Sequence, residues 1–302
     1  MLGRRLISAA IMISLMLLIL YADHWLGRSD GWGRPGLVLS GLAVLTSLLA
    51  AGEFTNLFES AASRVNGFAL AVASMLMVAV TCAPALWENY PPDCALGRFG
   101  FAFSGLILGF VVLLLVEMAQ YGGQTDDASG AIIDRLGRSL LALVYINMLL
   151  GFLINHRYLE NNNSLGLLAI VTMITTVKLS DASAYFTGKS IGTIKLAPKL
   201  SPGKTVQGSI GGLVGGCVGT AICIYLVAPQ LFDLTIDKAW WWVLLYGVLV
   251  TLAGMMGDLA ESLIKRDANI KDSSSWLPGL GGILDVVDSM VFAAPVSYLL
   301  WI

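Results

Sequence analysis

The sequence predicts an all-α polytopic membrane protein with about nine transmembrane helices. Of its 302 residues, 57% are apolar and only 13% are charged, whereas soluble domains usually carry about 25% charged residues. Apolar runs close to the roughly 20 residues that a membrane-spanning helix needs recur along the whole chain. No polar stretch between these runs is long enough for a soluble domain. The net charge of −2 indicates no general affinity for nucleic acid.

Nine apolar segments are the predicted membrane helices. Polar or glycine- and proline-rich breaks separate them, such as "GRSDGWGRPG" and "GGQTDDASG". The first segment has a basic start and an apolar core, as a signal peptide has, but no convincing small-residue cleavage pattern follows, so we expect a retained helix. The nine segments are 6–22, 36–52, 67–86, 99–118, 139–155, 164–186, 208–232, 239–264 and 281–302.

The lysines and arginines of the loops predict a cytoplasmic N-terminus. In this orientation, twelve basic residues fall on the cytoplasmic side and five on the other side, as the positive-inside rule requires. The loops 187–207 and 265–280 then face the cytoplasm, and the C-terminus faces outward.

The seventh segment carries two interleaved ladders of glycine at every fourth position. Such ladders let helices approach closely in lipid, so they predict packing rather than chemistry. The two ladders are Gly208, Gly212, Gly216 and Gly211, Gly215, Gly219.

Three predicted helices carry pairs of ionisable residues near their cytoplasmic ends. Charged groups inside membrane segments are costly and usually functional, and an i, i+3 spacing places both members of a pair on one helix face. The alternative is that these side chains are simply solvated at the membrane interface. The pairs are Lys178 and Asp181, Asp258 and Glu261, and Asp285 and Asp288.

Converging carboxylates without equal numbers of cations must share protons or bind a metal ion. Oxygen-only ligands favour Mg²⁺ or a similar hard ion. The two histidines, His24 and His156, both fall in loops predicted to lie on the outside, which argues against zinc.

The stretch "KLSPGKTVQG" contains Gly203-Lys204-Thr205, which resembles the end of a phosphate-binding P-loop. The pattern fails because the first glycine of a P-loop would stand at Pro198, and no apolar strand precedes it. The loop around this stretch nevertheless contains four lysines among glycines, which predicts a polyphosphate site beside the carboxylates. The alternative is an ordinary positive-inside loop. The lysines are Lys189, Lys195, Lys199 and Lys204.

Two long blocks, "SDASAYFTGKSIGTIKLAPKLSPGKTVQG" and "GDLAESLIKRDANIKDSSSWLPGLGGILDVVDS", resemble the phosphatidate cytidylyltransferases, or CDP-diacylglycerol synthases. The resemblance covers the chain from Ser180 onward. It implies an enzyme of the cytoplasmic membrane that joins CTP and phosphatidic acid to give CDP-diacylglycerol and pyrophosphate. It also implies Mg²⁺, and two metal ions would suit the chemistry. A homodimer is compatible with the resemblance, although nothing in the sequence itself indicates one.

The resemblance assigns roles residue by residue. Asp258, Asp285 and Asp288 would hold the metal and, with Lys204, form the catalytic set. The residues implied to contact or shape the substrate site are Asp181, Lys189, Ser201, Lys265, Arg266, Lys271 and Asp272. Residues 164–302 would then be the catalytic region, with the cytoplasmic loops 187–207 and 265–280, and residues 1–163 would be a scaffold of helices.

Three positions depart from the usual family pattern. Leu280 stands where histidine is usual, Val286 where arginine is usual, and Gln207 where glutamate is usual. If the family's arginine and glutamate pair, losing both would compensate.

Two alternative functions stay open. One is a CTP-dependent lipid kinase, or a synthase for another lipid phosphate. The other is a catalytically degenerate relative that serves as a membrane scaffold or transporter, against which the retained membrane carboxylates argue.

Overall fold

The computed structural model of the protein describes most of the chain, and all structural statements below concern these residues. The described ranges are 15–16, 18–27, 35–58, 64–87, 90–91, 94–122, 130–159, 162–270, 273–274 and 281–302. Most of the first predicted segment, 6–22, lies outside them, although residues 18–26 are helical.

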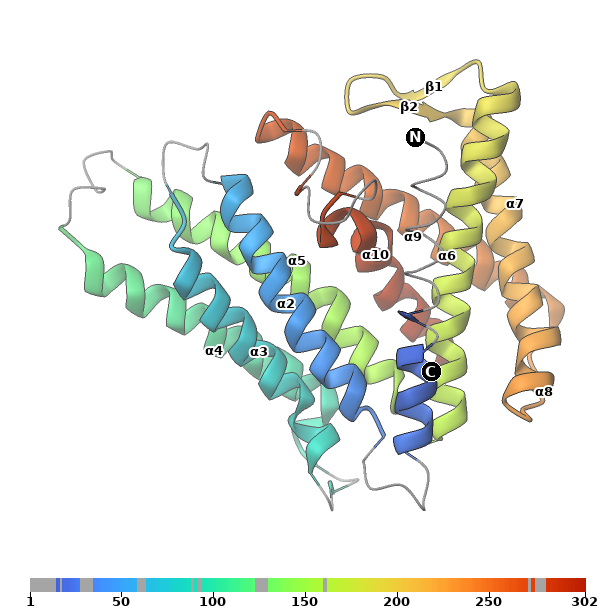
Figure 1. Ribbon diagram of the computed structural model, residues 1–302, viewed down its shortest axis with the longest axis horizontal. Coiled ribbons are helices and arrows are strands. Elements are labelled where there is room, and N and C mark those ends of the chain that lie inside the picture. Colours follow the sequence, from blue (N-terminus) through green and yellow to red (C-terminus); the bar gives the residue numbers. More distant parts are fainter. Residues whose placement is uncertain are drawn as a thin grey trace. The chain divides into compact units, whose positions relative to one another are not determined.

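The all-α polytopic membrane class is confirmed. Eight helical stretches of the described chain are long and apolar enough to cross a membrane (Figure 1). They correspond to the second to ninth predicted segments. They are α2 (Leu37–Phe58), α3 (Gly67–Leu86), α4 (Gly97–Gln120), α5 (Ala131–His156), α6 (Asn163–Ile191), α7 (Val206–Ile222) with its continuation through the π-helical η2 (Cys223–Val227) into α8 (Ala228–Leu231), α9 (Trp240–Asp267) and α10 (Ile283–Trp301).

The placement of the two histidines in loops was wrong. His156 is the last residue of α5 and fully buried, and His24 lies in the helical stretch 18–26. Helix α5 continues past its polar residues because Asn147 and Asn155 each donate a hydrogen bond to the carbonyl four residues earlier, both at 2.7 Å. These side chains are thereby satisfied without leaving the helix.

The chain forms two compact units. The first contains the described residues of 1–155 and 267–286, and the second contains 156–266 and 287–302. Helix α10 therefore contributes its first turn to the first unit and its remainder to the second. The expected assignment of catalysis to residues 164–302 is a functional statement and stays a prediction.

The core of the first unit lies where α3, α4 and α5 meet. Ala73 and Met77 of α3 pack with Leu113 of α4 and Leu143 of α5. A buried ion pair joins α4 to α5 nearby, with Arg135 Nη2 2.7 Å from Glu117 Oε2. Such a pair satisfies both charges inside an apolar layer.

The second unit is organised around the glycine ladders of α7. A Cβ atom on Gly211 would overlap Thr187 of α6, and one on Gly215 would overlap Ser183. A Cβ on Gly216 would overlap Thr251 of α9. The expectation that the ladders serve close helix packing is therefore confirmed.

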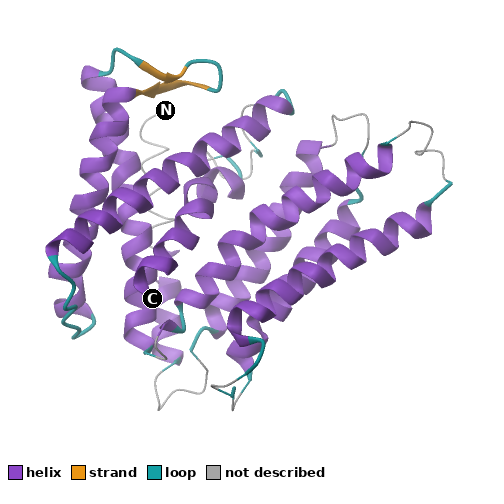
Figure 2. Cartoon of the chain, turned by 180° about the vertical axis from the view of Figure 1, so that it is seen from behind, coloured by secondary structure: helices purple, strands orange, loops and turns teal. Residues whose placement is uncertain are grey.

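A β-hairpin joins α6 to α7, where the sequence analysis expected only a loop. Strands β1 (Lys195–Ala197) and β2 (Ser201–Thr205) pair antiparallel, with Lys195 opposite Thr205 (Figures 1 and 2). The expected loop 187–207 thus consists of the last turn of α6, this hairpin and the start of α7. The sequence did not predict the hairpin, because prolines and lysines interrupt the alternation of apolar and polar residues that is typical of strands.

The base of the hairpin is fixed by two side chains. Gln207 accepts hydrogen bonds from the backbone N–H groups of Thr193 and Ile194 at 3.1 and 3.2 Å. The Thr205 hydroxyl accepts from the N–H of Gly208 at 3.1 Å and caps α7. Because Gly203-Lys204-Thr205 is part of strand β2, which runs directly into α7, these residues do not form the loop between a strand and a helix that defines a P-loop.

Candidate functional site

A cavity of about 540 Å³ lies in the second unit, beside the hairpin and between α6, α7 and α9. Apolar and small residues such as Met255 and Gly208 form part of its wall. The polar part contains five side chains that the sequence analysis assigned to the site. These are Asp181, Lys189, Ser201, Lys204 and Asp258.

An ion pair between Lys204 and Asp258 is the central contact of this cavity. The Lys204 Nζ atom lies 2.7 Å from Asp258 Oδ2, and the two side chains remain 23% and 32% exposed. Lys204 is held on β2 directly before the residue that caps α7. The Lys204 Nζ atom itself is buried, so a phosphate that binds the ammonium group would have to displace the carboxylate.

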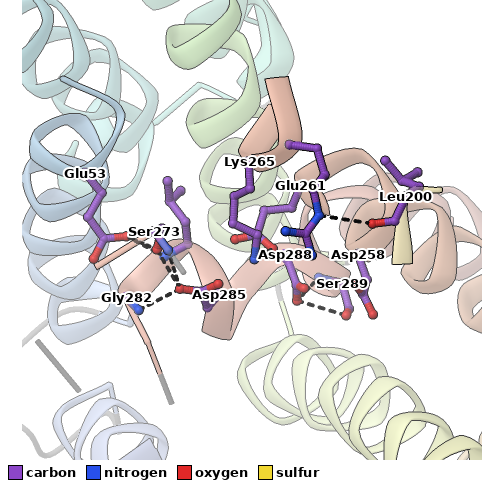
Figure 3. A network of polar contacts seen from close by, with 12 residues as sticks. Glu53, Leu200, Asp258, Glu261, Lys265, Ser273, Gly282, Asp285, Asp288 and Ser289 are labelled. Atoms are coloured by element: carbon purple, nitrogen blue, oxygen red, sulfur yellow. Dashed lines mark hydrogen bonds and ion pairs between the residues drawn. The ribbon is translucent and has the colours of Figure 1, made fainter. Parts of the chain in front are cut away.

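Two further aspartates surround this pair. Asp181 of α6 interacts electrostatically with Lys178, Lys204 and Asp258. Asp288 of α10 is buried and interacts electrostatically with Asp258, Asp181 and Lys178. Figure 3 shows Asp288 near Asp258 and Ser289. Three carboxyl groups and two ammonium groups thus share one region, and the carboxyl groups repel one another when all three are ionised. This repulsion favours binding of a cation.

Glycine at position 257 explains why α9 and α10 come together at this level. A Cβ atom there would overlap the backbone oxygen of Asp288. Asp288 is further oriented by Ser289, whose N–H and hydroxyl donate to Asp288 Oδ1 at 2.5 and 3.0 Å. The glycine of the "GD" block therefore sets the distance between the backbones that carry Asp258 and Asp288.

The two basic residues at the end of α9 have other contacts. Lys265 Nζ lies 2.6 Å from Glu261 Oε2, and this pair is 12% and 5% exposed. Arg266 Nε donates to the carbonyl of Leu200 at 3.4 Å and so links α9 to the turn of the hairpin (Figure 3). Neither Lys265 nor Arg266 lines the cavity, and their roles in substrate binding stay predictions.

Asp285 belongs to the first unit and has a different environment. Its Oδ2 atom accepts hydrogen bonds from the N–H and hydroxyl of Ser273 at 3.0 and 2.7 Å. It also accepts from the N–H of Gly282 at 2.8 Å (Figure 3). This carboxylate thus organises the start of α10.

Sequence reasoning missed Glu53, which lies in the same cluster. It is 8% exposed on α2 and accepts hydrogen bonds from Ser273, Ile283 and Leu284. A signal was available, because a single acid follows a long apolar run here. The predicted segment ended at residue 52, so Glu53 was counted as part of a loop.

The metal ligands stay predictions. The described part of the chain contains no group of three or more histidine, cysteine, aspartate or glutamate side chains arranged to hold one ion. Three residues of the sequence argument lie outside the described residues, namely Lys271, Asp272 and Leu280. The acids that are described would offer a metal ion only oxygen ligands, which are the ligands that Mg²⁺ prefers.

The fold and the cavity define a multi-pass membrane protein with a charged site formed by a hairpin and helix ends. The chain belongs to the cytidylyltransferase family, whose model matches residues 3–302.

Curated relatives extend this comparison. A phosphatidate cytidylyltransferase of Bacillus subtilis is 38% identical over 169 residues, which cover 55% of this chain and 58% of that protein. Two staphylococcal proteins with the same name match over 89% of this chain and 92% of their own length. They are those of Staphylococcus epidermidis, 30% identical, and Staphylococcus saprophyticus, 37% identical.

Proposed function

We propose that this protein transfers the cytidylyl group of CTP to phosphatidic acid in the cell membrane. A phosphate oxygen of the lipid forms a bond to the α-phosphorus of CTP. The bond from that phosphorus to the oxygen bridging to the β-phosphorus breaks, and pyrophosphate leaves with the electron pair. CDP-diacylglycerol remains in the membrane.

The observation that carries this proposal is the ion pair between Lys204 and Asp258, two residues that line the 540 Å³ cavity. It supplies a cation for phosphate oxygens and a carboxylate that is released when the cation is drawn away. The family membership supports the same reading, because the curated relatives are named for this reaction.

The chemistry needs positioning and charge compensation more than proton transfer. The attacking oxygen belongs to an ionised phosphate, so no base has to create the nucleophile. Lys204 and Lys189 both line the cavity, where their ammonium groups would bind the phosphates of CTP. Ser201 offers a hydroxyl donor on the same wall. Donors placed before the reaction begins lower its barrier most effectively.

We propose Mg²⁺ as the cofactor, held by Asp258 and Asp288 together with Asp285, the set that the family resemblance implies. Asp181, which lines the cavity beside Asp258, is a further oxygen donor. When bound, the ion would offset the negative charge on the phosphates of CTP. The number of ions and the formation of a homodimer are separate proposals, each of which needs its own measurement.

The comparisons do not favour the alternative functions. A CTP-dependent kinase would release CDP instead of pyrophosphate, and a degenerate scaffold or carrier would bind no CTP in a Mg²⁺-dependent way. The relatives that match over most of the chain are named for cytidylyl transfer.

A turnover assay tests the proposal. Purified protein in detergent receives CTP, phosphatidic acid and Mg²⁺, and both products are quantified. We expect CDP-diacylglycerol and pyrophosphate in equal amounts from the parent protein, formed about a thousandfold more slowly by Asp258→Asn. CDP as the released nucleotide, or no product from folded parent protein, would refute the proposed function.

A further inference from the structure

The start of α10 is held by a carboxylate that comes from 230 residues earlier in the chain. Glu53 Oε1 accepts the N–H of Ile283 at 2.7 Å, and Glu53 Oε2 accepts the N–H of Leu284 at 2.9 Å. Figure 3 shows this side chain pointing at the cluster around Ser273. The first N–H groups of a helix have no partner within the helix, and a negative charge near them is stabilised by the helix dipole.

Ser273 connects Glu53 to Asp285. Its hydroxyl lies 3.0 Å from Glu53 Oε2 and 2.7 Å from Asp285 Oδ2. Asp285 also accepts the N–H of Gly282 at 2.8 Å. The N–H groups of three consecutive residues at the start of α10 are therefore bound by two carboxylates. This helix end is occupied by the protein's own acids and is not a phosphate-binding site.

The two glycines before α10 are required by this arrangement. Gly281 has a φ of +89°, and a Cβ atom there would overlap Asp285 Oδ2. A Cβ atom on Gly282 would overlap Ser273 Oγ and both carboxylate oxygens of Glu53. The glycine pair thus leaves room for the two carboxylates, which indicates that Glu53 and Asp285 are built into this segment together.

We propose that Glu53 is a positioning residue for the reaction. It fixes the rotation of the first turn of α10, and through Ser273 it fixes the carboxylate of Asp285. Asp288 lies on the next turn of the same continuous helix, so the anchor also sets the direction in which Asp288 points. Glu53 itself contacts no substrate in this account. The inference rests on the proposed function for its catalytic consequence.

Glu53→Gln tests the role with little change in volume. The amide has one acceptor oxygen, and its NH₂ group would face the N–H and O–H donors that the carboxylate now binds. We expect kcat to fall about tenfold while KM for CTP changes by less than about twofold. Ser273→Ala should lower kcat as well, and the double variant should be no more than about twofold slower than Glu53→Gln, because both changes break one arrangement.

Glu117→Gln is the matched control. Glu117 is as buried as Glu53, at 8% exposed, in the same unit, but it pairs with Arg135 and not with α10. Its replacement should lower the thermal unfolding temperature and leave kcat per folded molecule unchanged. Parental kcat in folded Glu53→Gln, or an equal loss of kcat in Glu117→Gln, would overturn the proposal.

Amide hydrogen exchange separates this inference from the proposed function. We expect the amides of Ile283 and Leu284 to exchange faster in Glu53→Gln than in the parent protein, and at the parental rate in Glu117→Gln. If the parent protein makes no CDP-diacylglycerol, the proposed function fails, and the exchange experiment still decides whether Glu53 anchors α10. Unchanged exchange in Glu53→Gln would contradict the anchor directly.

Discussion

Asp258, in the second half of α9, and Asp285, in the first turn of α10, are both acids of apolar helices, and the two units of the protein use them differently. Asp258 lines the cavity of the second unit and pairs with the ammonium group of Lys204 at 2.7 Å. Asp285, in the first unit, accepts two backbone N–H groups and one hydroxyl. An ammonium group can change partners when a phosphate arrives, whereas backbone donors cannot move away. Similar sequence positions therefore conceal one exchangeable and one fixed carboxylate.

The largest effect should come from Asp258→Asn. This change removes the charge that orients Lys204 and that contributes to the proposed cation site, so we expect kcat to fall by about a thousandfold. Steady-state turnover of CTP with phosphatidic acid measures it. Asp237→Asn, an exposed acid of the same unit, is the control and should leave kcat unchanged. Parental turnover in Asp258→Asn would show that the exchangeable pair is not part of the site.

A smaller effect is expected for Lys204→Met. The ammonium group binds phosphate oxygens in our account, and a hydrogen bond to a charged group contributes about 1.5–3 kcal/mol, so kcat/KM for CTP should fall about 10- to 100-fold. Lys195→Met, in the first strand of the same hairpin but outside the cavity, should change kcat/KM by less than about twofold. Equal losses in both variants would mean that the hairpin acts only through its overall charge.

Asp285→Asn should lower turnover, because Asp285 belongs to the proposed metal-binding set, and it should also destabilise the fold more than Asp258→Asn does. The amide retains one acceptor oxygen and brings an NH₂ group against fixed donors, so the unfolding free energy should fall by about 2 kcal/mol. Thermal unfolding in detergent measures this loss. Asp134→Asn, which breaks an exposed pair with Arg138 in the same unit, should change stability by less than about 1 kcal/mol. If Asp285→Asn is as stable as the parent protein while Asp258→Asn is less stable, Asp285 is not the fixed carboxylate of the pair, and our comparison is contradicted.

The smallest effect is expected at Gln207. Glutamate at this position keeps an oxygen for the N–H groups of Thr193 and Ile194, so Gln207→Glu should change kcat by less than about twofold.

Turnover of Val286→Arg, alone and combined with Gln207→Glu, tests whether the two departures from the family pattern compensate. The compensation idea fails if neither the single nor the double change alters activity.

The helices were predictable because their signal is local. A long apolar run predicts a membrane helix wherever it occurs, and the second to ninth segments were placed correctly. Their ends were less accurate: α6 continues to Ile191 although its apolar run ends near residue 186. A helix continues in a polar environment as long as its backbone and side chains find partners, and hydropathy does not report this.

The sequence predicted which residues belong to the site, but not the contacts that bring them together. The acids and lysines stand out against an apolar background, and four of them line one cavity together with Ser201. The hairpin that carries Lys204 has no strand pattern, and side chains outside its strands contact it, Gln207 at Thr193 and Arg266 at Leu200. The contact between Glu53 and α10 spans 230 residues, so no local spacing could reveal it.

The most direct test of the central claim follows the phosphorus atoms of CTP. Parent protein, Asp258→Asn and Asp237→Asn are supplied with phosphatidic acid, Mg²⁺ and CTP labelled at either the α- or the γ-phosphorus. Our account predicts that the α-label enters the lipid and the γ-label enters pyrophosphate, in the parent and Asp237→Asn proteins but not in Asp258→Asn. Transfer of the γ-label to lipid, or undiminished transfer of the α-label by Asp258→Asn, would contradict it.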